Sequence, residues 1–184
     1  MNELILGMTG RIDSWKGHRY VIEAMARLKH LPLKLHILGT YHLARNPNLK
    51  TELDALIKET GMADKIEFFG YVANPSGHVG KMDVVLAPSD YEPFGLVAVE
   101  AMALKKPVIA TRGTGFEESV EDGVTGFLVE PKNSVQIAEK IEILYSNPQL
   151  RQQFGEAGFE RYRALFMIES HITKLAELYR EALK

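Results

Sequence analysis

Two carboxylates stand eight residues apart in the most informative stretch of the sequence, Ala87 to Thr111. They are Glu92 and Glu100, and the residues from Phe94 to Leu104 are apolar except for Glu100. A helix that is apolar all round is a buried helix, and a carboxylate buried without a partner is costly. Glu100 therefore needs either a cation inside the protein or a ligand in a cavity that the helix lines. The alternative is an ordinary helix start, with Glu92 near the cap and Glu100 in a buried salt bridge.

The start of this helix is a candidate anion site. Pro93 suits the first position of a helix, where its missing N–H costs nothing. The first N–H groups of a helix have no intrahelical acceptor and the helix dipole is positive there, so an anion, most often a phosphate, can bind. Phe94, Gly95 and Leu96 supply these N–H groups, and Gly95 lets the backbone approach a ligand closely. The preceding run, Asp83–Leu86, has the composition of a buried strand, and ligands of open α/β sheets bind outside the carboxyl ends of the strands.

Two cations lie in a glycine-containing loop near the start of the chain. The loop, Gly7 to Gly17, follows a predicted strand at 3–6 and leads into a predicted helix at 16–30, and it contains Arg11 and Lys16. Two cations suit two phosphates, because Arg offers a planar fork of donors and Lys a point charge. The more common role for any Lys or Arg is that of a solvated surface cation. The loop has no G-x-G-x-x-G fingerprint, so a dinucleotide site gains little support.

Strand-like and helix-like patterns alternate along the chain as far as Val129, and helices alone fill the remainder. This alternation predicts a Rossmann-like α/β fold, in which a parallel sheet carries helices on both faces, with a helical C-terminus. We expect strands at 3–6, 33–38, 66–69, 83–86, 107–111 and 126–129, and helices at 16–30, 48–60, 93–104, 134–146, 149–165 and 168–183.

Composition limits the class of protein. The chain has 184 residues, of which 46% are hydrophobic, and a net charge of −2. These values predict one globular domain without a broad basic surface for nucleic acid. The absence of cysteine excludes a disulfide framework and thiolate metal sites. No apolar run approaches a membrane span and no signal peptide is visible, so we expect a soluble, cytoplasmic protein. The first strand begins almost at Met1, which indicates a domain cut from a longer protein.

The residues of these loops resemble a known family. Glu92-Pro-Phe-Gly-Leu with Glu100, followed by Pro107-Val-Ile-Ala-Thr, is similar to the E-x(7)-E region of retaining glycosyltransferases of the GT-B fold, the group 1 glycosyl transferases. Glycogen and sucrose synthases and many bacterial mannosyl- and glucosyltransferases belong to this group. Arg11 and Lys16 match its G-R-(x)-x-x-x-K-G loop, and the resemblance covers nearly the whole chain.

The resemblance implies that residues 1–184 form a single nucleotide-sugar-binding domain, the C-terminal half of a GT-B enzyme whose N-terminal acceptor domain is absent. It implies a nucleoside-diphosphate sugar as the ligand, with no cofactor and no metal ion. Arg11 and Lys16 are expected to hold the diphosphate and, with Glu92, to act in catalysis, while Glu92 contacts sugar hydroxyls and Glu100 the ribose hydroxyls. The loops at 39–40 and 71–72 are expected near the base and ribose, largely through their backbone. The donor-binding residues implied are Gly10, Arg11, Lys16, Gly39, Thr40, Tyr71, Val72, Glu92, Phe94, Gly95, Leu96 and Glu100.

The chain departs from the family pattern in two places. In the loop after 107–111 the family has two adjacent glycines and a following Glu, and this chain has Thr114 at the first of these positions and Glu118 at the last. That departure bears on the sugar preference. Lys105 stands where the family commonly has glycine, in a turn that we expect at the surface. In the family the terminal helix, here 168–183, crosses back onto the other domain.

The function predicted is retaining transfer of a hexosyl group from a nucleoside-diphosphate sugar to an acceptor, with the chain alone expected to be inactive. Three alternatives remain. The first is a sugar-nucleotide epimerase of the same fold, against which the E-x(7)-E region argues. The second is an isolated nucleotide-binding module without activity of its own. The third is a structural domain whose terminal helices dock a partner, and it predicts no nucleotide binding.

Overall fold

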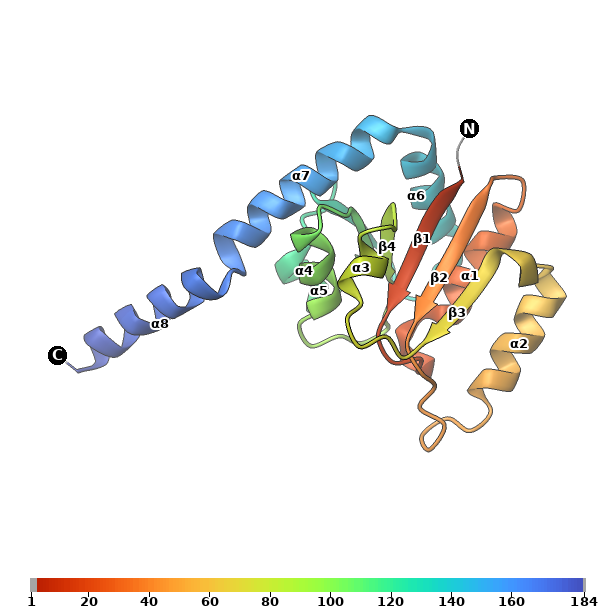
Figure 1. The fold of residues 1–184 in the computed structure, drawn as a ribbon, viewed down its shortest axis with the longest axis horizontal. Coiled ribbons are helices and arrows are strands. Elements are labelled where there is room, and N and C mark those ends of the chain that lie inside the picture. The colour runs from red at the N-terminus through yellow and green to blue at the C-terminus, as the bar shows by residue number, and fades with distance from the viewer. Residues whose placement is uncertain (1–2, 184) are drawn as a thin grey trace.

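Six short strands form one sheet, and every neighbouring pair is parallel, as the sequence predicts. Figure 1 labels β1 to β4 of this sheet and the helices around it. The computed structural model describes residues 3–183. The strand order is β3-β2-β1-β4-β5-β6, so the direction of winding reverses between β1 and β4. The strands are β1 (Leu4–Thr9), β2 (Leu33–Leu38), β3 (Ile66–Gly70), β4 (Val84–Ala87), β5 (Val108–Thr111) and β6 (Gly126–Val129).

Helices cover both faces of the sheet. Buried residues of α1, α2 and α6 form one apolar cluster with the strands, and those of α3, α4 and α5 form a second cluster on the other face. The Rossmann-like α/β architecture is therefore confirmed. The helices are α1 (His18–Arg27), α2 (Leu49–Thr60), α3 (Ser76–Val79), α4 (Leu96–Ala103), α5 (Phe116–Ser119), α6 (Ser134–Ser146), α7 (Pro148–Leu165) and α8 (Ile168–Ala182).

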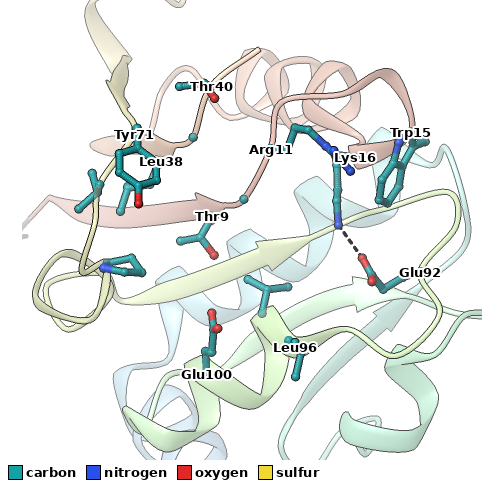
Figure 2. A pocket seen from close by; sticks show the side chains of 15 residues that line it. Thr9, Arg11, Trp15, Lys16, Leu38, Thr40, Tyr71, Glu92, Leu96 and Glu100 are labelled. Atoms are coloured by element: carbon teal, nitrogen blue, oxygen red, sulfur yellow. Dashed lines mark hydrogen bonds and ion pairs between the residues drawn. The ribbon is translucent and has the colours of Figure 1, made fainter. Parts of the chain in front are cut away.

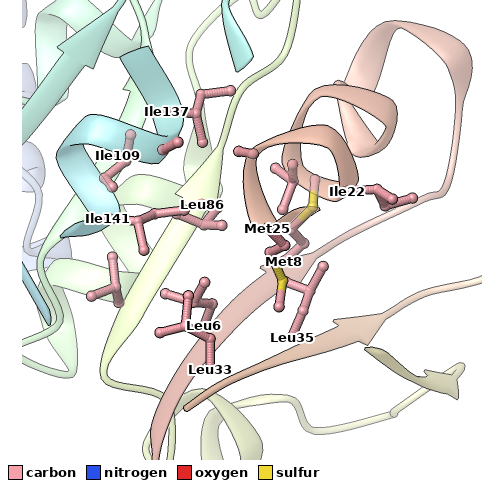
Figure 3. Packing of buried hydrophobic residues seen from close by; sticks show 14 of the residues in the cluster. Leu6, Met8, Ile22, Met25, Leu33, Leu35, Leu86, Ile109, Ile137 and Ile141 are labelled. Carbon is pink, nitrogen blue, oxygen red and sulfur yellow. The ribbon is translucent and has the colours of Figure 1, made fainter. Parts of the chain in front are cut away.

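Strand β4 contributes side chains to both apolar clusters. Val84 and Leu86 belong to the cluster under α1 and α6, while Val85 and Ala87 belong to the cluster under α4. Successive side chains of a strand point to opposite faces, so a strand covered by helices on both sides needs apolar residues at every position. Figure 3 shows the first cluster, where Leu86 lies among the side chains of the sheet and of its covering helices.

The reversal between β1 and β4 creates the crevice of the molecule. β1 leads into α1 on one face of the sheet, whereas β4 leads into α4 on the other face. The loops that follow these two neighbouring strands therefore diverge. In open α/β sheets a ligand site forms at this switch point, outside the carboxyl ends of the strands.

The start of α4 differs from the sequence prediction. The helix begins at Leu96 and not at Pro93, because Gly95 has a φ of 88° and forms the N-cap. A Cβ atom at Gly95 would lie 2.3 Å from the buried ring of Phe116, so only glycine fits at this position. The expectation of a helix buried all round was also wrong, since the side chain of Leu96 is 64% exposed.

Two further turns depend on left-handed backbone. Gly17 has a φ of 76°, so α1 begins at His18, and Lys16 instead closes a short 3-10 helix, Ser14–Lys16. Lys105 has a φ of 56°, a conformation that favours glycine, and its ammonium pairs with Glu156 on α7 at 2.8 Å. The prediction of a surface turn at Lys105 is confirmed by its exposed side chain.

Helix α8 extends away from the body of the molecule (Figure 1). Its apolar residues lie open to solvent, and Ile172 and Leu178 are about three-fifths exposed, at 58% and 62%. Within residues 3–183, no helix combines the length and the hydrophobicity needed to cross a membrane.

Two glycines of similar backbone conformation allow a test of how tightly the loop after β1 packs against the loop after β4. Gly17 and Gly61 have φ values of 76° and 70°, but a Cβ at Gly17 would lie 2.0 Å from the Pro88 carbonyl oxygen, whereas a Cβ at Gly61 would meet nothing within 4 Å. We expect Gly61→Ala to lower the free energy of unfolding by about 1 kcal/mol, from backbone strain alone. Gly17→Ala should lose about 2 kcal/mol more because the backbone of the neighbouring loop must move. Equal losses in urea unfolding would contradict the packing described.

Candidate functional site

A cavity of about 620 Å³ lies at the switch point of the sheet (Figure 2). It is bounded by the carboxyl ends of β1 and β2, by the loops that follow β1, β3 and β4, and by the first turns of α4. Its size is that of a small-molecule site. The lining residues are Thr9, Gly10, Arg11, Trp15, Lys16, Leu38, Gly39, Thr40, Tyr71, Val72, Pro75, Glu92, Leu96, Val97 and Glu100.

The structure brings nearly all of the sequence-predicted site residues together. Only Phe94 and Gly95 of that set do not line the cavity, since they lie in the bend before α4. Thr9 and Leu38 were missed, although each ends or nearly ends a parallel strand and could have been found from that rule. Val97 was also missed, although it lies three residues before Glu100 on the same helix and could have been found from that spacing. Trp15 and Pro75 were missed as well, and for these no sequence signal was available because loop geometry decides which way they face.

Lys16 and Glu92 form an ion pair across the crevice. Lys16 Nζ lies 2.6 Å from Glu92 Oε2, and the two side chains are only 20% and 14% exposed. The same ammonium lies 4.2 Å from the centre of the Trp15 ring, within the range of a cation–π contact. The loop after β1 is thereby tied to the loop after β4. Lys16 is thus not the freely solvated surface cation that the sequence left as an alternative.

Arg11 is the exposed cation of the same loop. Its guanidinium makes no hydrogen bond or ion pair with any residue of the described chain, 3–183. Figure 2 shows Arg11 and Lys16 on the loop after β1, with Glu100 facing the cavity from α4. An Arg side chain whose five donors are unmatched beside a cavity can bind an anion there in bidentate fashion.

Glu100 meets no cation in the described structure, so the alternative of a buried salt bridge was wrong for this residue. Its side chain lies on the cavity wall together with Val97 and Leu96. Partial burial against these apolar neighbours raises the pKa of the Glu100 carboxyl above its ordinary value. A carboxylate that has lost part of its hydration gains from hydroxyl or amide donors on a ligand.

The N–H groups that α4 offers are shifted by the late start of the helix. Leu96 and Val97 occupy the first turn and line the cavity, while the N–H of the next residue, Ala98, already donates to the Gly95 carbonyl. The free helix N–H groups expected at residues 94–96 are therefore those of Leu96 and Val97, because a helix presents free donors only from its own first turn.

The loop after β5 supports the site without lining it. The N–H of Gly115 donates to the backbone carbonyl of Glu92 at 2.7 Å, and a side chain at Gly115 would lie 2.3 Å from the Pro93 carbonyl oxygen. Thr114, which replaces a glycine of the family pattern, donates its hydroxyl to the Thr111 carbonyl at 2.9 Å. The departure from the family pattern is thus accommodated within the loop itself.

His18 is the first residue of α1, directly after the loop that carries Arg11 and Lys16, and it is buried, at 4% exposed. Its burial, followed by the positive charge of Lys16, lowers the pKa of His18 to about 4, while the backbone and carboxylate of Asp13 act in the opposite direction. The imidazole is therefore neutral at physiological pH. Among the described residues, no three His, Asp or Glu side chains gather in a group that could hold a metal ion.

Three comparisons relate this site to known proteins. The family model described as Glycosyl transferases group 1 matches residues 1–161. The chain is 35% identical over 176 residues to the D-inositol 3-phosphate glycosyltransferase of Arthrobacter sp. (strain FB24), an alignment that covers 88% of this chain and 41% of that protein. The chain spans less than half the length of the curated relatives it matches.

Solved structures share the fold over nine-tenths of this chain or more. Anabaena Alr3699/HepE in complex with UDP superposes with a TM-score of 0.92 at 28% identity, over 98% of this chain and 49% of that one. The C-terminal domain of LpcC, a glycosyl transferase group 1 family protein of Francisella tularensis, superposes with a TM-score of 0.82 at 34% identity, over 90% of this chain and 87% of that one.

The energetic weight of the ion pair across the crevice can be measured against a matched exposed pair. Lys50 and Asp54 on α2 also approach to 2.6 Å, but their side chains are 55% and 49% exposed. Double-mutant cycles with alanine should give a coupling energy of about 1–2 kcal/mol for Lys16 and Glu92, and at most about 0.5 kcal/mol for the exposed pair. Addition of 1 M NaCl should weaken the exposed pair more. Equal couplings would show that the crevice pair is as solvated as the pair on α2.

Acid should destabilise the protein in part through His18. The pKa of His18 is about 4 in the folded chain and 6.5 in the unfolded chain, so as the pH falls the unfolded chain is protonated before the folded one. The contribution of His18 to stability is therefore present above pH 6.5 and is lost as the pH falls toward 4. Between pH 7 and pH 5 the parent chain should lose about 2 kcal/mol more unfolding free energy than His18→Gln. The exposed histidine variant His30→Gln serves as the control and should follow the parent chain. An unchanged pH profile in His18→Gln would contradict the buried neutral imidazole.

Proposed function

This chain belongs to the glycosyl transferases group 1 family, and we propose that it is the half of such an enzyme that binds the nucleoside-diphosphate sugar. The observation that carries the proposal is the pair of cations, Arg11 and Lys16, beside a cavity whose opposite wall bears Glu100. Diphosphate and ribose are the two parts of the donor that this chemistry fits. The full reaction proposed is retaining transfer of a hexosyl group to an acceptor.

The cations act on the leaving group in this proposal. Negative charge grows on the diphosphate as its bond to the sugar breaks, so Arg11 and Lys16 stabilise the transition state more than the bound substrate. The N–H groups of Leu96 and Val97 at the positive end of α4 add fixed donors on the other side of the cavity. Arg11, the helix terminus and Lys16, whose ammonium is shared with Glu92, supply the positive charge that Mg²⁺ provides elsewhere, so we propose binding without a metal ion.

Glu92 and Glu100 have separate tasks in the proposed complex. Glu100 accepts hydrogen bonds from the ribose hydroxyls, and these bonds stabilise its partly buried carboxylate. Glu92 accepts hydrogen bonds from the sugar hydroxyls in this proposal, and its pairing with Lys16 supports a role beside the diphosphate. Thr40 and the largely exposed ring of Tyr71, at 78%, lie where the base is expected.

The acceptor is expected to bind a second domain. The chain covers 41% of the inositol 3-phosphate enzyme and 49% of HepE, which is consistent with an N-terminal half beyond this chain. Helix α8 leaves Ile172 and Leu178 uncovered, and such a half could pack on them. On this basis the chain alone binds donor but transfers no sugar, so it behaves as the nucleotide-binding module of the second alternative.

Calorimetry of the chain against UDP, GDP and ADP, with and without Mg²⁺, tests the proposal. UDP comes first because solved structures of HepE contain UDP and UDP-glucose. We expect one nucleotide to bind without Mg²⁺, and Arg11→Ala and Glu100→Ala each to weaken it about 10- to 100-fold while the fold remains intact, since each removes hydrogen bonds to or from a charged group. Arg19→Ala and Glu118→Ala remove exposed charges outside the cavity and should change the affinity less than twofold.

The outcomes separate the alternatives. Binding that survives Arg11→Ala and Glu100→Ala would contradict the site, and binding that requires Mg²⁺ would contradict the metal-free proposal. Turnover of a nucleotide sugar by the chain alone would show that no second half is needed. No binding of any nucleotide would contradict the donor-binding role of this chain and favour a structural domain.

A further inference from the structure

Asp13 is a buried carboxylate next to the cavity that the reaction proposed above does not use. It is 1% exposed and does not line the cavity. It stands between Arg11 and Lys16 in the chain and caps the 3-10 helix that ends with Lys16. A carboxylate buried at such a place is costly unless its oxygens are hydrogen-bonded, so its contacts reveal its role.

Those contacts tie together two loops that lie far apart in the sequence. Asp13 Oδ1 accepts a hydrogen bond from the Ser14 N–H at 2.8 Å and a second from Asn46 Nδ2 at 2.6 Å. Asp13 Oδ2 has no hydrogen-bond partner in the described structure, and His42 Nδ1 lies 3.8 Å from it. Asn46 and His42 both belong to the loop between β2 and α2.

The same two loops are joined by backbone hydrogen bonds on the cavity side. The N–H of Ile12 donates to the Thr40 carbonyl at 2.9 Å, and the N–H of His42 donates to the Ile12 carbonyl at 3.1 Å. These bonds extend the parallel pairing of β1 with β2 past the ends of the strands. Arg11 is thus held by its backbone between Gly10 and Ile12, while its side chain makes no hydrogen bond or ion pair with residues 3–183.

Lys16 differs from Arg11 in this respect. Its backbone N–H donates to the Asp13 carbonyl at 3.1 Å, but its ammonium is held by Glu92 and by the Trp15 ring. The direction in which Arg11 points depends instead on the course of the backbone from Gly10 to Asp13. A hydrogen bond to a buried carboxylate is about twice as strong as one between neutral groups, so the Asn46 amide is the main side-chain restraint on that course.

We propose that Asp13 and Asn46 form a positioning pair, which aims Arg11 at the diphosphate of the ligand without touching that ligand. The proposal rests on the proposed function of the cavity. It assigns to the loop between β2 and α2 a role in phosphate affinity, although the side chains of this loop beyond Thr40 lie outside the cavity lining.

Asn46→Asp tests the pair, because it keeps the shape of the side chain and places a second carboxylate against Asp13. Asn48→Asp is the matched control: it adds the same charge two residues further on, at an exposed position whose side chain makes no capping hydrogen bond. Affinities are measured by calorimetry for the nucleoside diphosphate that the parent chain binds, and by NMR titration for the matching nucleoside, with folding of each variant checked by circular dichroism. We expect Asn46→Asp to weaken the diphosphate about 10-fold and the nucleoside less than twofold, and Asn48→Asp to change neither by more than twofold.

A second comparison asks whether the effect passes through Arg11. In an Arg11→Ala background, Asn46→Asp should cause less than a twofold further loss, because the group that the pair aims is gone. A full 10-fold loss in that background, an equal loss for the nucleoside, or equal behaviour of Asn46→Asp and Asn48→Asp would each overturn the inference while leaving the proposed function intact. A parent chain that binds no nucleoside diphosphate would instead contradict the proposed function, and the inference would fall with it.

Discussion

The reversal of strand order between β1 and β4 is the constraint on which the rest of the structure depends. Parallel strands present all their carboxyl ends at one edge of the sheet, and helices on opposite faces force the loops after β1 and β4 to separate. The four charged groups of the crevice, Arg11, Lys16, Glu92 and Glu100, are carried by those loops or by the helix that one of them begins. The crevice is therefore a consequence of topology, and the side chains determine only what it can hold.

The charges around the crevice divide into those that are satisfied within the protein and those that are not. Lys16 and Glu92 neutralise each other at 2.6 Å and link the two diverging loops. Arg11 and Glu100 have no such partner in the described structure, and the pKa of Glu100 is raised by its surroundings. Arg11 and Glu100 are both exposed beside the cavity, so each is free to interact with a ligand, and the proposed donor site uses both.

The sequence predicted the sheet, its helices and most of the cavity lining because these follow from patterns that are local. The strands at 33–38 and 126–129 have the predicted limits, and Gly61 ends α2 as a C-terminal glycine should. The prediction failed where long-range contacts override local preference. Pro93 is a good first residue for a helix, yet the helix starts at Leu96 because the buried ring of Phe116, distant in sequence, leaves room only for glycine in a left-handed conformation at Gly95. Similarly, nothing near Asp13 in the sequence announces that its partner is Asn46, since their contact depends on the parallel pairing of β1 with β2.

The unmatched groups also limit which ligands fit the proposal. Arg11 requires an anion with several acceptor atoms, and Glu100, which accepts hydrogen bonds when ionised, requires donors such as hydroxyls. Partial burial raises the pKa of the Glu100 carboxyl, and hydrogen bonds donated by a ligand favour its ionised form. A free phosphate meets the first demand and a neutral sugar the second. A nucleoside-diphosphate sugar meets both at once, because its ribose and its diphosphate are joined at a fixed separation within one molecule. That joint demand is why the two walls of the cavity support one donor site better than two independent sites.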